Sequence, residues 1–396
     1  MLKKIRVQQL QPGMYVHALC GSWLSHDFWR TSFLIDKPEI LEKLRAGAVQ
    51  EVWIDTARGK DVAEPTPAAK LSALRHDTQA SALGPELQRA AALCEEARDA
   101  VKRMFSEARM GKALDVNAAN ALVDAVCSSV ERHPDALISV ARLKTADNYT
   151  YMHSVAVCGL MVALARKMEL PAQQIMQAGM AGLLHDMGKA HSPQDILNKP
   201  GALTDEEFAS MKQHPVQGYA MLQGSVEDED VLDACLHHHE RIDGKGYPHG
   251  LGGDDLRLIT RMTAICDVYD AITSDRPYKK GWSPGVALQR MAQWCPHHLD
   301  ADIFNTFVQT IGLYPVGSLV RLQSGLLGVV CAPAQNSMST PMVAAFYHIE
   351  LQRMLRPAKL LDLEKLPDER IVAGEDPSQW PFKNLESLWQ RAAAAA

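Results

Sequence analysis

The sequence predicts a multi-domain, mainly α-helical protein, in which an all-helical bundle is flanked by a small N-terminal α/β module and a small C-terminal β appendage. Three observations support this fold class. The chain has 396 residues, which is enough for two or three domains. Nearly everything from Asp115 to Leu313 shows apolar residues at helical spacing. Short segments with strand-like alternation and turn residues replace this pattern at both ends of the chain.

Residues 1–62 are expected to form an accessory or regulatory module. Pro38 to Ala46 is predicted as a helix, because Pro38 suits the first helical turn and Gly47 suits the stop. The aromatic residues between Trp23 and Phe33 belong either to the core, which is the favoured interpretation, or to a docking surface. Short strands are predicted at Ile5–Leu10, Met14–Leu19 and Val52–Ile54.

Residues 63–84 are predicted to be a linker, because alanine, proline, aspartate and lysine dominate this stretch. Residues 85–134 follow as coupling helices. Pro85 to Met110 repeats apolar residues at helical spacing, and Asn117–His133 is amphipathic. The first of these helices either simply lies on the next domain, which is the favoured interpretation, or couples domains or subunits.

Residues 135–315 are predicted to form the main helical domain. The segment Val155–Lys167 is apolar on all sides, so this helix should be buried. Gly244–Gly253 is rich in glycine and is predicted as a loop. Further helices are expected at 171–187, 204–222, 228–240, 256–273, 284–294 and 300–312.

Residues 316–396 are predicted to form a β appendage and a tail. Alternating residues predict strands at Ser318–Leu322, Leu326–Cys331 and Met342–Ile349, with Ser324-Gly325 as a hairpin turn. The final stretch Ala392–Ala396 gives no structural indication.

Composition argues against several kinds of partner. A net charge of −6 creates no field that would favour nucleic acid or an acidic membrane. The start of the chain has no signal peptide, and the longest uncharged apolar run, Val155 to Ala165, is too short to span a membrane. Eight scattered cysteines without a Cys-x-x-Cys pair indicate reduced thiols, not disulfides or a zinc cluster. A cytoplasmic protein is therefore expected.

Three ionisable residues, His185, Asp186 and Lys189, follow the apolar run from Ile175 to Leu184. Burying them at the end of an apolar helix would be costly unless they were paired or bound to a metal. Neighbouring helical residues point about 100° apart, so His185 and Asp186 could reach two sides of one polar cavity. Such a pair alone is only a weak indication of a metal site.

Further candidate ligands lie on other predicted helices. Eight of the fifteen histidines fall between residues 153 and 249, and no more than two of the consecutive histidines 237–239 can easily face one cavity. Each histidine alone could be an ordinary core residue. Five histidines and two aspartates on separate buried helices are hard to explain in that way. The candidate ligands are His153, His185, Asp186, His214, His238, His239 and Asp267.

Seven ligands without a thiolate exceed the needs of one tetrahedral zinc ion. They suit two six-coordinate divalent ions that share a bridging aspartate. Nitrogen and oxygen ligands in that geometry favour iron or manganese. Two such ions can clamp a phosphoryl group and stabilise its attacking and leaving oxygens. The sequence therefore indicates a binuclear metal site for phosphoryl chemistry.

Two motifs carry a resemblance to a known family. They are His185-Asp186-Met187-Gly188-Lys189 and the long stretch from His238 to Pro248, and shorter matches lie at 197–201, 267–271 and 273–278. In these residues the chain resembles the HD-GYP family, a bacterial branch of the HD superfamily of metal-dependent phosphohydrolases. The resemblance covers residues 140–315, and the segments Gly13–Val16 and Ser22–Leu24 resemble the uncharacterised domain that often precedes HD-GYP domains.

The resemblance implies an all-helical HD-type catalytic domain at 135–315 that hydrolyses cyclic di-GMP to pGpG, and in some members onward to GMP. It implies that the seven candidate ligands hold two metal ions, with Asp186 as the bridge. Asp186 and Lys189 would then be catalytic, with Lys189 contacting the substrate phosphate or the nucleophile. The implied substrate-binding residues are Gly246, Tyr247, Asp270, Arg276 and Lys279.

Some family members hold three metals, using an acidic residue one turn before the first histidine. Tyr149 stands there in this sequence, which favours two metals. Cyclic di-GMP is the expected partner, while a homodimer and a diguanylate cyclase or other signalling protein remain open. One rival interpretation is a slow or inactive cyclic di-GMP sensor that docks on proteins; the complete ligand set argues against it. Another is an HD phosphohydrolase for a different nucleotide; the Gly246-Tyr247-Pro248 loop argues against it.

Overall fold

The computed structural model describes residues 2–7, 10–19, 32–46, 51–60, 83–141, 149–197, 199, 201–275, 281–334, 337–382 and 385. The chain divides into two compact units, Met1–Thr66 and Pro67–Ala396, each with its own hydrophobic core. The predicted linker at 63–84 lies outside the described residues, except for Leu83 and Gly84, which already belong to a helix. The finer domain boundaries stay a prediction.

The first unit is a small antiparallel sheet with one helix. Its elements are β1 (Leu2–Arg6), β2 (Tyr15–Leu19), β3 (Phe33–Leu34), α1 (Pro38–Ala46) and β4 (Glu51–Asp55), with the strand order β1-β4-β2-β3. The predicted bounds Ile5–Leu10 for the first strand are wrong, because β1 spans Leu2–Arg6 and the Leu10 amide donates to the Val7 carbonyl outside the ladder. Phe33 packs against the core, and Trp23 to Trp29 lie outside the described residues.

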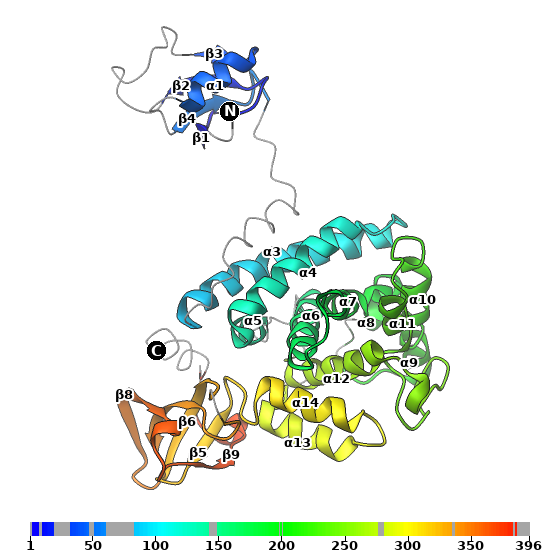
Figure 1. The fold of residues 1–396 in the computed structure, drawn as a ribbon, viewed down its shortest axis with the longest axis vertical. Coiled ribbons are helices and arrows are strands. Elements are labelled where there is room, and N and C mark those ends of the chain that lie inside the picture. Colours follow the sequence, from blue (N-terminus) through cyan, green and yellow to red (C-terminus); the bar gives the residue numbers. More distant parts are fainter. Residues whose placement is uncertain are drawn as a thin grey trace. The chain divides into compact units, whose positions relative to one another are not determined.

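The second unit is a helical bundle followed by a β-sheet (Figure 1), which confirms the predicted fold class. Two short 3-10 helices, η4 (Met187–His191) and η5 (Gly253–Asp255), interrupt the bundle. Its α-helices are α3 (Leu83–Arg109), α4 (Val116–Arg132), α5 (Pro134–Ala141), α6 (Tyr149–Lys167), α7 (Ala172–Leu184), α8 (Gln194–Leu197), α9 (Asp205–Met211), α10 (His214–Leu222), α11 (Glu229–His237), α12 (Leu258–Thr273), α13 (Pro284–Trp294) and α14 (Ala301–Ile311).

Helix α6 is the centre of the bundle. It contacts α3, α4, α5, α7, α12 and α14, and its side chains are divided between two hydrophobic cores that lie on different faces of the helix. This explains why its sequence is apolar on all sides. Gly182 allows α7 to approach closely, since a Cβ there would lie 2.9 Å from the backbone of Cys158. The close contact of α6 with α7 and α12 brings the candidate ligands of three helices together.

Two predicted helices run too far, and a third is interrupted. The helix predicted at 171–187 ends at Leu184, and the one at 228–240 ends at His237. The helix predicted at 204–222 is divided into α9 and α10. Each of these errors falls at a candidate ligand: α7 ends just before His185, α11 ends just before His238, and α10 begins at His214.

The C-terminal sheet extends beyond its prediction. Strands β5 (Leu319–Leu322), β6 (Leu326–Ala332) and β7 (Met342–His348) match the predicted segments, and Gly325 forms the predicted turn with φ +75°. Two further strands, β8 (Arg353–Asp362) and β9 (Ile371–Gly374), complete the order β8-β7-β6-β5-β9. The core of the sheet also receives Leu87 of α3, so the appendage packs on the bundle.

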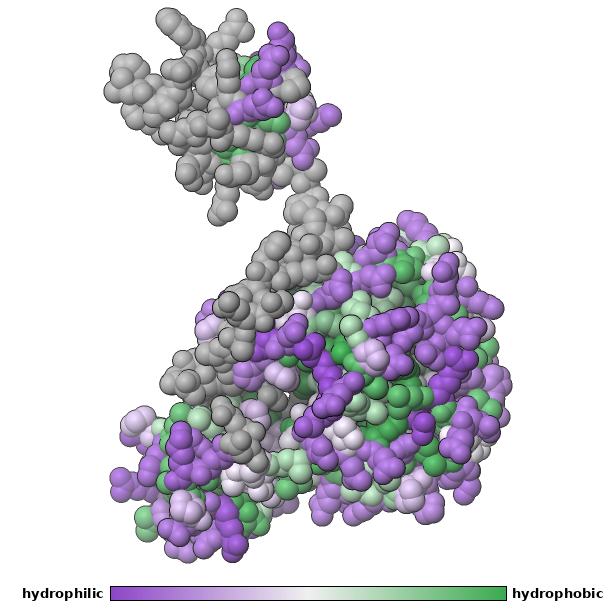
Figure 2. Space-filling view, in the orientation of Figure 1, coloured by the Kyte–Doolittle hydropathy of each residue, from purple (hydrophilic) through white to green (hydrophobic). Residues whose placement is uncertain are grey.

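The surface and the thiols agree with the composition. Figure 2 shows hydrophobic residues along the middle of the visible face of the bundle and mostly hydrophilic residues around them. The cysteines of the described residues are all free, and five of them are buried. Within the same residues, no helix has both the length and the hydropathy that crossing a bilayer would require.

Candidate metal centre

The candidate metal centre begins where α7 ends. His185 caps α7, and Asp186 leads into η4, so the prediction that both residues lie within a helix is wrong. The turn nevertheless directs both side chains into one buried cluster, with His185 0% and Asp186 1% exposed. Gly188 permits this tight turn, since a Cβ there would lie 1.8 Å from the His214 carbonyl oxygen.

Three candidate ligands orient their rings in the same way. In each, the ring Nδ1 lies beside a main-chain carbonyl of the preceding turn. A carbonyl oxygen only accepts hydrogen bonds, so each Nδ1 carries the proton and each Nε2 presents a lone pair to the cluster. The distances are 2.9 Å from His185 to Gly182, 2.7 Å from His214 to Met211 and 3.1 Å from His238 to Cys235.

In this tautomer, unprotonated ring nitrogens face one another inside the cluster. The Nε2 atoms of His214 and His238 lie 3.2 Å apart, although neither has a proton to donate. The Nε2 of His185 is buried and finds no hydrogen-bond partner among the described residues. Lone pairs that converge in this way in a buried site repel one another unless a metal ion binds between them. The donor set therefore fits metal ions.

A second part of the cluster joins α6 to α12. His153 of α6 lies with Nε2 3.0 Å from Asp267 Oδ1 and with Nδ1 2.6 Å from Asp270 Oδ2. Asp270 is 1% exposed and lies on the side of His153 that faces away from Asp267. The expected contact of Asp270 with a substrate stays a prediction. A carboxylate that accepts the Nδ1 proton of a ligating histidine fixes the ring and raises its basicity, and Asp270 has this position relative to the candidate ligand His153.

Asp186 lies between the two parts of the cluster. Its Oδ1 lies 3.3 Å from His214 Nε2, and its Oδ2 lies 3.5 Å from both His153 Nε2 and His185 Nε2. A carboxylate that faces two sets of imidazoles with its two oxygens has the geometry of a bridge between two ions. The residue groups that could each hold an ion are His214, His238 and His239; His153, His185 and Asp267; and His185, Asp186 and His238.

The electrostatics of the cluster suit cations. Burial lowers the pKa of His185 and His238, and it lowers the pKa of His239 to about 3, so these imidazoles are neutral. Burial raises the pKa of Asp186, but Lys189 and the neighbouring histidines outweigh it and hold that pKa well below its usual value. Burial also lowers the pKa of His153, but Asp267 and Asp270 raise it more. The neutral imidazoles of His185, His238 and His239 and the ionised carboxylate of Asp186 are the forms that bind metals.

Lys189 lies at the accessible side of the bridge. Its Nζ is 2.5 Å from Asp186 Oδ2, and its side chain is 19% exposed. The turn that carries Lys189 is fixed from outside by α3, because Arg109 Nε donates to the Ala190 carbonyl at 3.0 Å. Helix α3 thus lies on the helices of the main helical domain, as the favoured interpretation of the sequence has it, and it also contacts the turn of the site.

The glycine-rich loop covers His239. The ring of Tyr247 stacks on the ring of His239, with centroids 4.8 Å apart and an interplanar angle of 30°. Gly246 presses against the preceding segment, since a Cβ there would lie 2.3 Å from Glu240 Cα. Glu240 Oε1 accepts from the amides of His249 and Gly250 at 2.6 and 2.9 Å, which closes the loop. Close packing explains the glycine at 246, and its contact with a substrate stays a prediction.

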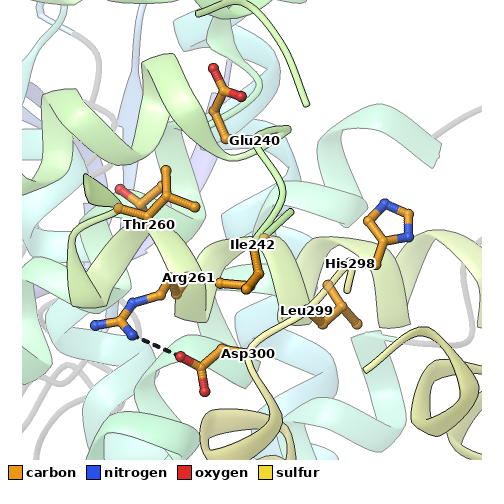
Figure 3. Close-up of a pocket in the computed structure, with 9 residues that line it drawn as sticks. Glu240, Ile242, Thr260, Arg261, His298, Leu299 and Asp300 are labelled. Carbon is orange, nitrogen blue, oxygen red and sulfur yellow. Dashed lines mark hydrogen bonds and ion pairs between the residues drawn. The ribbon is translucent and has the colours of Figure 1, made fainter. Parts of the chain in front are cut away.

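Only two of the three consecutive histidines face the cluster, as predicted. His237 turns away, with Nδ1 2.8 Å from Asp233 and Nε2 2.9 Å from His249. Figure 3 shows a small pocket that Glu240 and Ile242 line together with residues of α12 and with His298, Leu299 and Asp300. There Arg261 pairs with Asp300 at 2.8 Å, and the amides of Ile242 and Asp243 donate to the carbonyls of His298 and His297.

Two predicted site residues, Arg276 and Lys279, lie outside the described residues. Tyr149 is the first residue of α6, one turn before His153, and the number of metals stays a prediction. The structure brings the seven predicted ligands together and adds Asp270 and Arg109, whose roles the sequence did not reveal. The sequence gave an indication for Asp270 alone, because Asp270 follows Asp267 by three residues and shares its helix face.

A helical bundle with a buried histidine and aspartate cluster at the end of α7 is the arrangement of an HD-domain protein with a site for divalent metal ions. Comparison with known proteins agrees. Residues 127–303 match the family model "HD domain", and residues 2–119 match "Domain of unknown function (DUF3391)". The chain belongs to the HD-GYP family, in the arrangement with this second domain at its N-terminal side.

Individual relatives narrow the comparison. The chain is 50% identical to "Cyclic di-GMP phosphodiesterase PA4108" of Pseudomonas aeruginosa, over 98% of this chain and 96% of the relative. It is 42% identical to "Cyclic di-GMP phosphodiesterase response regulator RpfG" of Xanthomonas campestris pv. campestris, over 35% of this chain and 38% of the relative. It is 34% identical to "3'3'-cGAMP-specific phosphodiesterase 1" of Vibrio cholerae, over 42% of this chain and 39% of the relative.

Proposed function

We propose that this protein is a metal-dependent phosphodiesterase that hydrolyses cyclic di-GMP to pGpG, and product analysis decides whether GMP follows. The observation that carries the proposal is the position of one carboxylate, Asp186, between two sets of histidine side chains. The partly exposed Lys189 pairs with the same carboxylate. The similarity to PA4108 over nearly the whole chain supports the choice of substrate.

The proposed ligands are His153, His185 and Asp267 for one ion and His214, His238 and His239 for the other, with Asp186 between them. Nitrogen and oxygen donors without a thiolate support iron or manganese as the metals. When bound, the two ions supply Lewis acidity and a nucleophile derived from water.

The remaining chemistry belongs to side chains of the chain. Lys189 keeps Asp186 ionised and places an ammonium group where a phosphate oxygen would arrive, since its side chain is the exposed member of the pair. Tyr247 stacks on His239 and lines the guanine side of the substrate pocket. Asp270 holds the Nδ1 proton of His153, so that Nε2 stays available as a ligand.

The proposal is tested by metal analysis of anaerobically purified protein together with product analysis on cyclic di-GMP. We expect two equivalents of iron or manganese per chain and the appearance of pGpG. Binding of cyclic di-GMP without turnover at full metal occupancy would indicate a sensor instead. Turnover of another nucleotide alone would indicate a different HD phosphohydrolase. Light scattering on the same sample would test the homodimer, and co-purification with a diguanylate cyclase would test that partner.

A further inference from the structure

A lysine and two aromatic rings lead outward from the metal centre. Tyr247 stacks on the candidate ligand His239, with ring centroids 4.8 Å apart. Lys212 Nζ lies 5.3 Å from the centroid of the Tyr247 ring and 4.7 Å from the centroid of the Phe208 ring. The ammonium group of Lys212 therefore lies near two aromatic rings, and one of them, Tyr247, stacks on the candidate ligand His239.

Lys212 and Phe208 are unusual for surface residues. Phe208 is 48% exposed, although it is large and apolar, and α9 buries none of its residues. Among the described residues, Lys212 has no ion-pair partner, whereas Lys189 pairs with Asp186 at 2.5 Å and Lys199 with Glu207 at 2.6 Å. An exposed ring beside an unpaired ammonium group is the composition of a site for a base and an anion.

The backbone fixes Lys212 relative to the metal centre. The Lys212 amide donates to the Phe208 carbonyl at 3.0 Å, so both side chains leave the same helical turn. Two residues later, His214 Nδ1 lies 2.7 Å from the carbonyl of Met211, the residue just before Lys212. The segment that orients a candidate ligand therefore also carries the lysine, and the distance between them is set by one short stretch of chain.

The proposed substrate needs a second site of this kind. A cyclic dinucleotide of guanosine has two phosphodiester anions and two bases, and one phosphodiester occupies the metal centre during hydrolysis. We propose that Phe208 and Lys212, beside Tyr247, form an outer subsite for the other half of the substrate. Lys212 contacts the second phosphodiester, and Phe208 stacks on a guanine. This inference rests on the proposed function and deepens it.

The test compares Lys212→Ala, Lys212→Arg and the control Lys112→Ala in the metal-loaded full chain. Lys112 is an exposed lysine of the connection after α3, and no site residue lies in that connection. Kinetics are measured with cyclic di-GMP and with bis(p-nitrophenyl) phosphate, which has one phosphodiester and no second anion. We expect Lys212→Ala to raise KM for cyclic di-GMP roughly ten- to hundredfold. KM for the small diester and the metal content should not change, and Lys212→Arg should retain most of the affinity.

The role of Phe208 is tested by removing its aromatic ring or replacing it with a larger one. Phe208→Ala should raise KM for cyclic di-GMP roughly tenfold or more, and Phe208→Trp should restore it, because a larger ring still stacks. The outer subsite is refuted if KM for cyclic di-GMP is unchanged in Lys212→Ala and Phe208→Ala. It is also refuted if both substrates lose activity equally, since the residues would then support the metal centre.

Failure of the proposed function gives a result that differs from failure of the outer subsite. In that case the wild-type protein would cleave bis(p-nitrophenyl) phosphate and leave cyclic di-GMP intact. Calorimetry with cyclic di-GMP then decides on the subsite: weaker binding to Lys212→Ala than to the wild type supports it, and equal or absent binding overturns it.

Discussion

Replacing Asp270 with asparagine tests how the metal centre holds His153. Asp270 Oδ2 lies 2.6 Å from His153 Nδ1, and both side chains are buried. Asparagine keeps the shape of the side chain and can still accept the Nδ1 proton through its amide oxygen, but the negative charge is lost. Loss of such a carboxylate partner weakens metal binding about 10- to 100-fold, which corresponds to about 1.4–2.7 kcal/mol.

The assay is a titration of metal-free protein with Mn²⁺, followed by kinetics at saturating metal. We expect Asp270→Asn to raise the Kd of one ion by about 10- to 100-fold. Asp270→Ala should lose more, and its free energy of unfolding should fall by about 1–3 kcal/mol, because the Nδ1 proton of His153 is left buried without an acceptor. At saturating Mn²⁺, KM for cyclic di-GMP should equal that of the wild type in Asp270→Asn.

Two results would refute this reasoning. Unchanged affinity for Mn²⁺ in Asp270→Asn would show that the charge of Asp270 does not support a metal ligand. A raised KM at saturating metal would instead return Asp270 to the substrate-binding role that the sequence predicted. The two readouts separate positioning of a ligand from contact with the substrate.

Three further predictions follow from the same geometry. Asp186→Ala should reduce hydrolysis below detection and lower the metal content, because it removes the carboxylate between the two groups of histidines; normal occupancy by metal analysis would contradict the bridge. His239→Ala should weaken metal binding about tenfold or more, whereas His237→Ala, which alters the ring bonded to Asp233, should leave it unchanged; equal metal affinities in the two variants would exclude His239 as a ligand. A protein that lacks residues 1–66, the first compact unit, should keep its metals and measurable hydrolysis; loss of metals would place that unit in the catalytic core.

Local sequence rules predicted some helices to the residue and others poorly. The bounds 38–46 and 284–294 are correct because Pro38 and Pro284 occupy the first turn, where proline is tolerated. The helices predicted at 171–187 and 228–240 run too far because apolar periodicity continues past their ends. Both helices end where His185 and His238 turn toward a shared cluster. That turn depends on contacts between distant segments, which no local pattern contains.

The strands that were not predicted are edge strands. Strand β8 is exposed on both faces for most of its length, so it lacks the alternation of a half-buried strand. It also contains Pro357, which argues against a central strand but is tolerated at an edge, because one side of the strand needs no hydrogen bonds. Strand β3 has only two residues, too few for any period to show.

The seven candidate ligands could be found from the sequence, because each is a histidine or aspartate beside an apolar run, and such groups need a partner when they are buried. Which partner each one meets depends on contacts between distant helices. Asp270 meets His153 across 117 positions of the chain, and Arg109 reaches Ala190 across 81. The same limit applies to Lys212, since its sequence neighbours do not show that Tyr247 lies beside it. The ligands are thus predictable as residue types, while the residues that position them and receive the substrate emerge only when α3, α6, α9 and α12 are packed together.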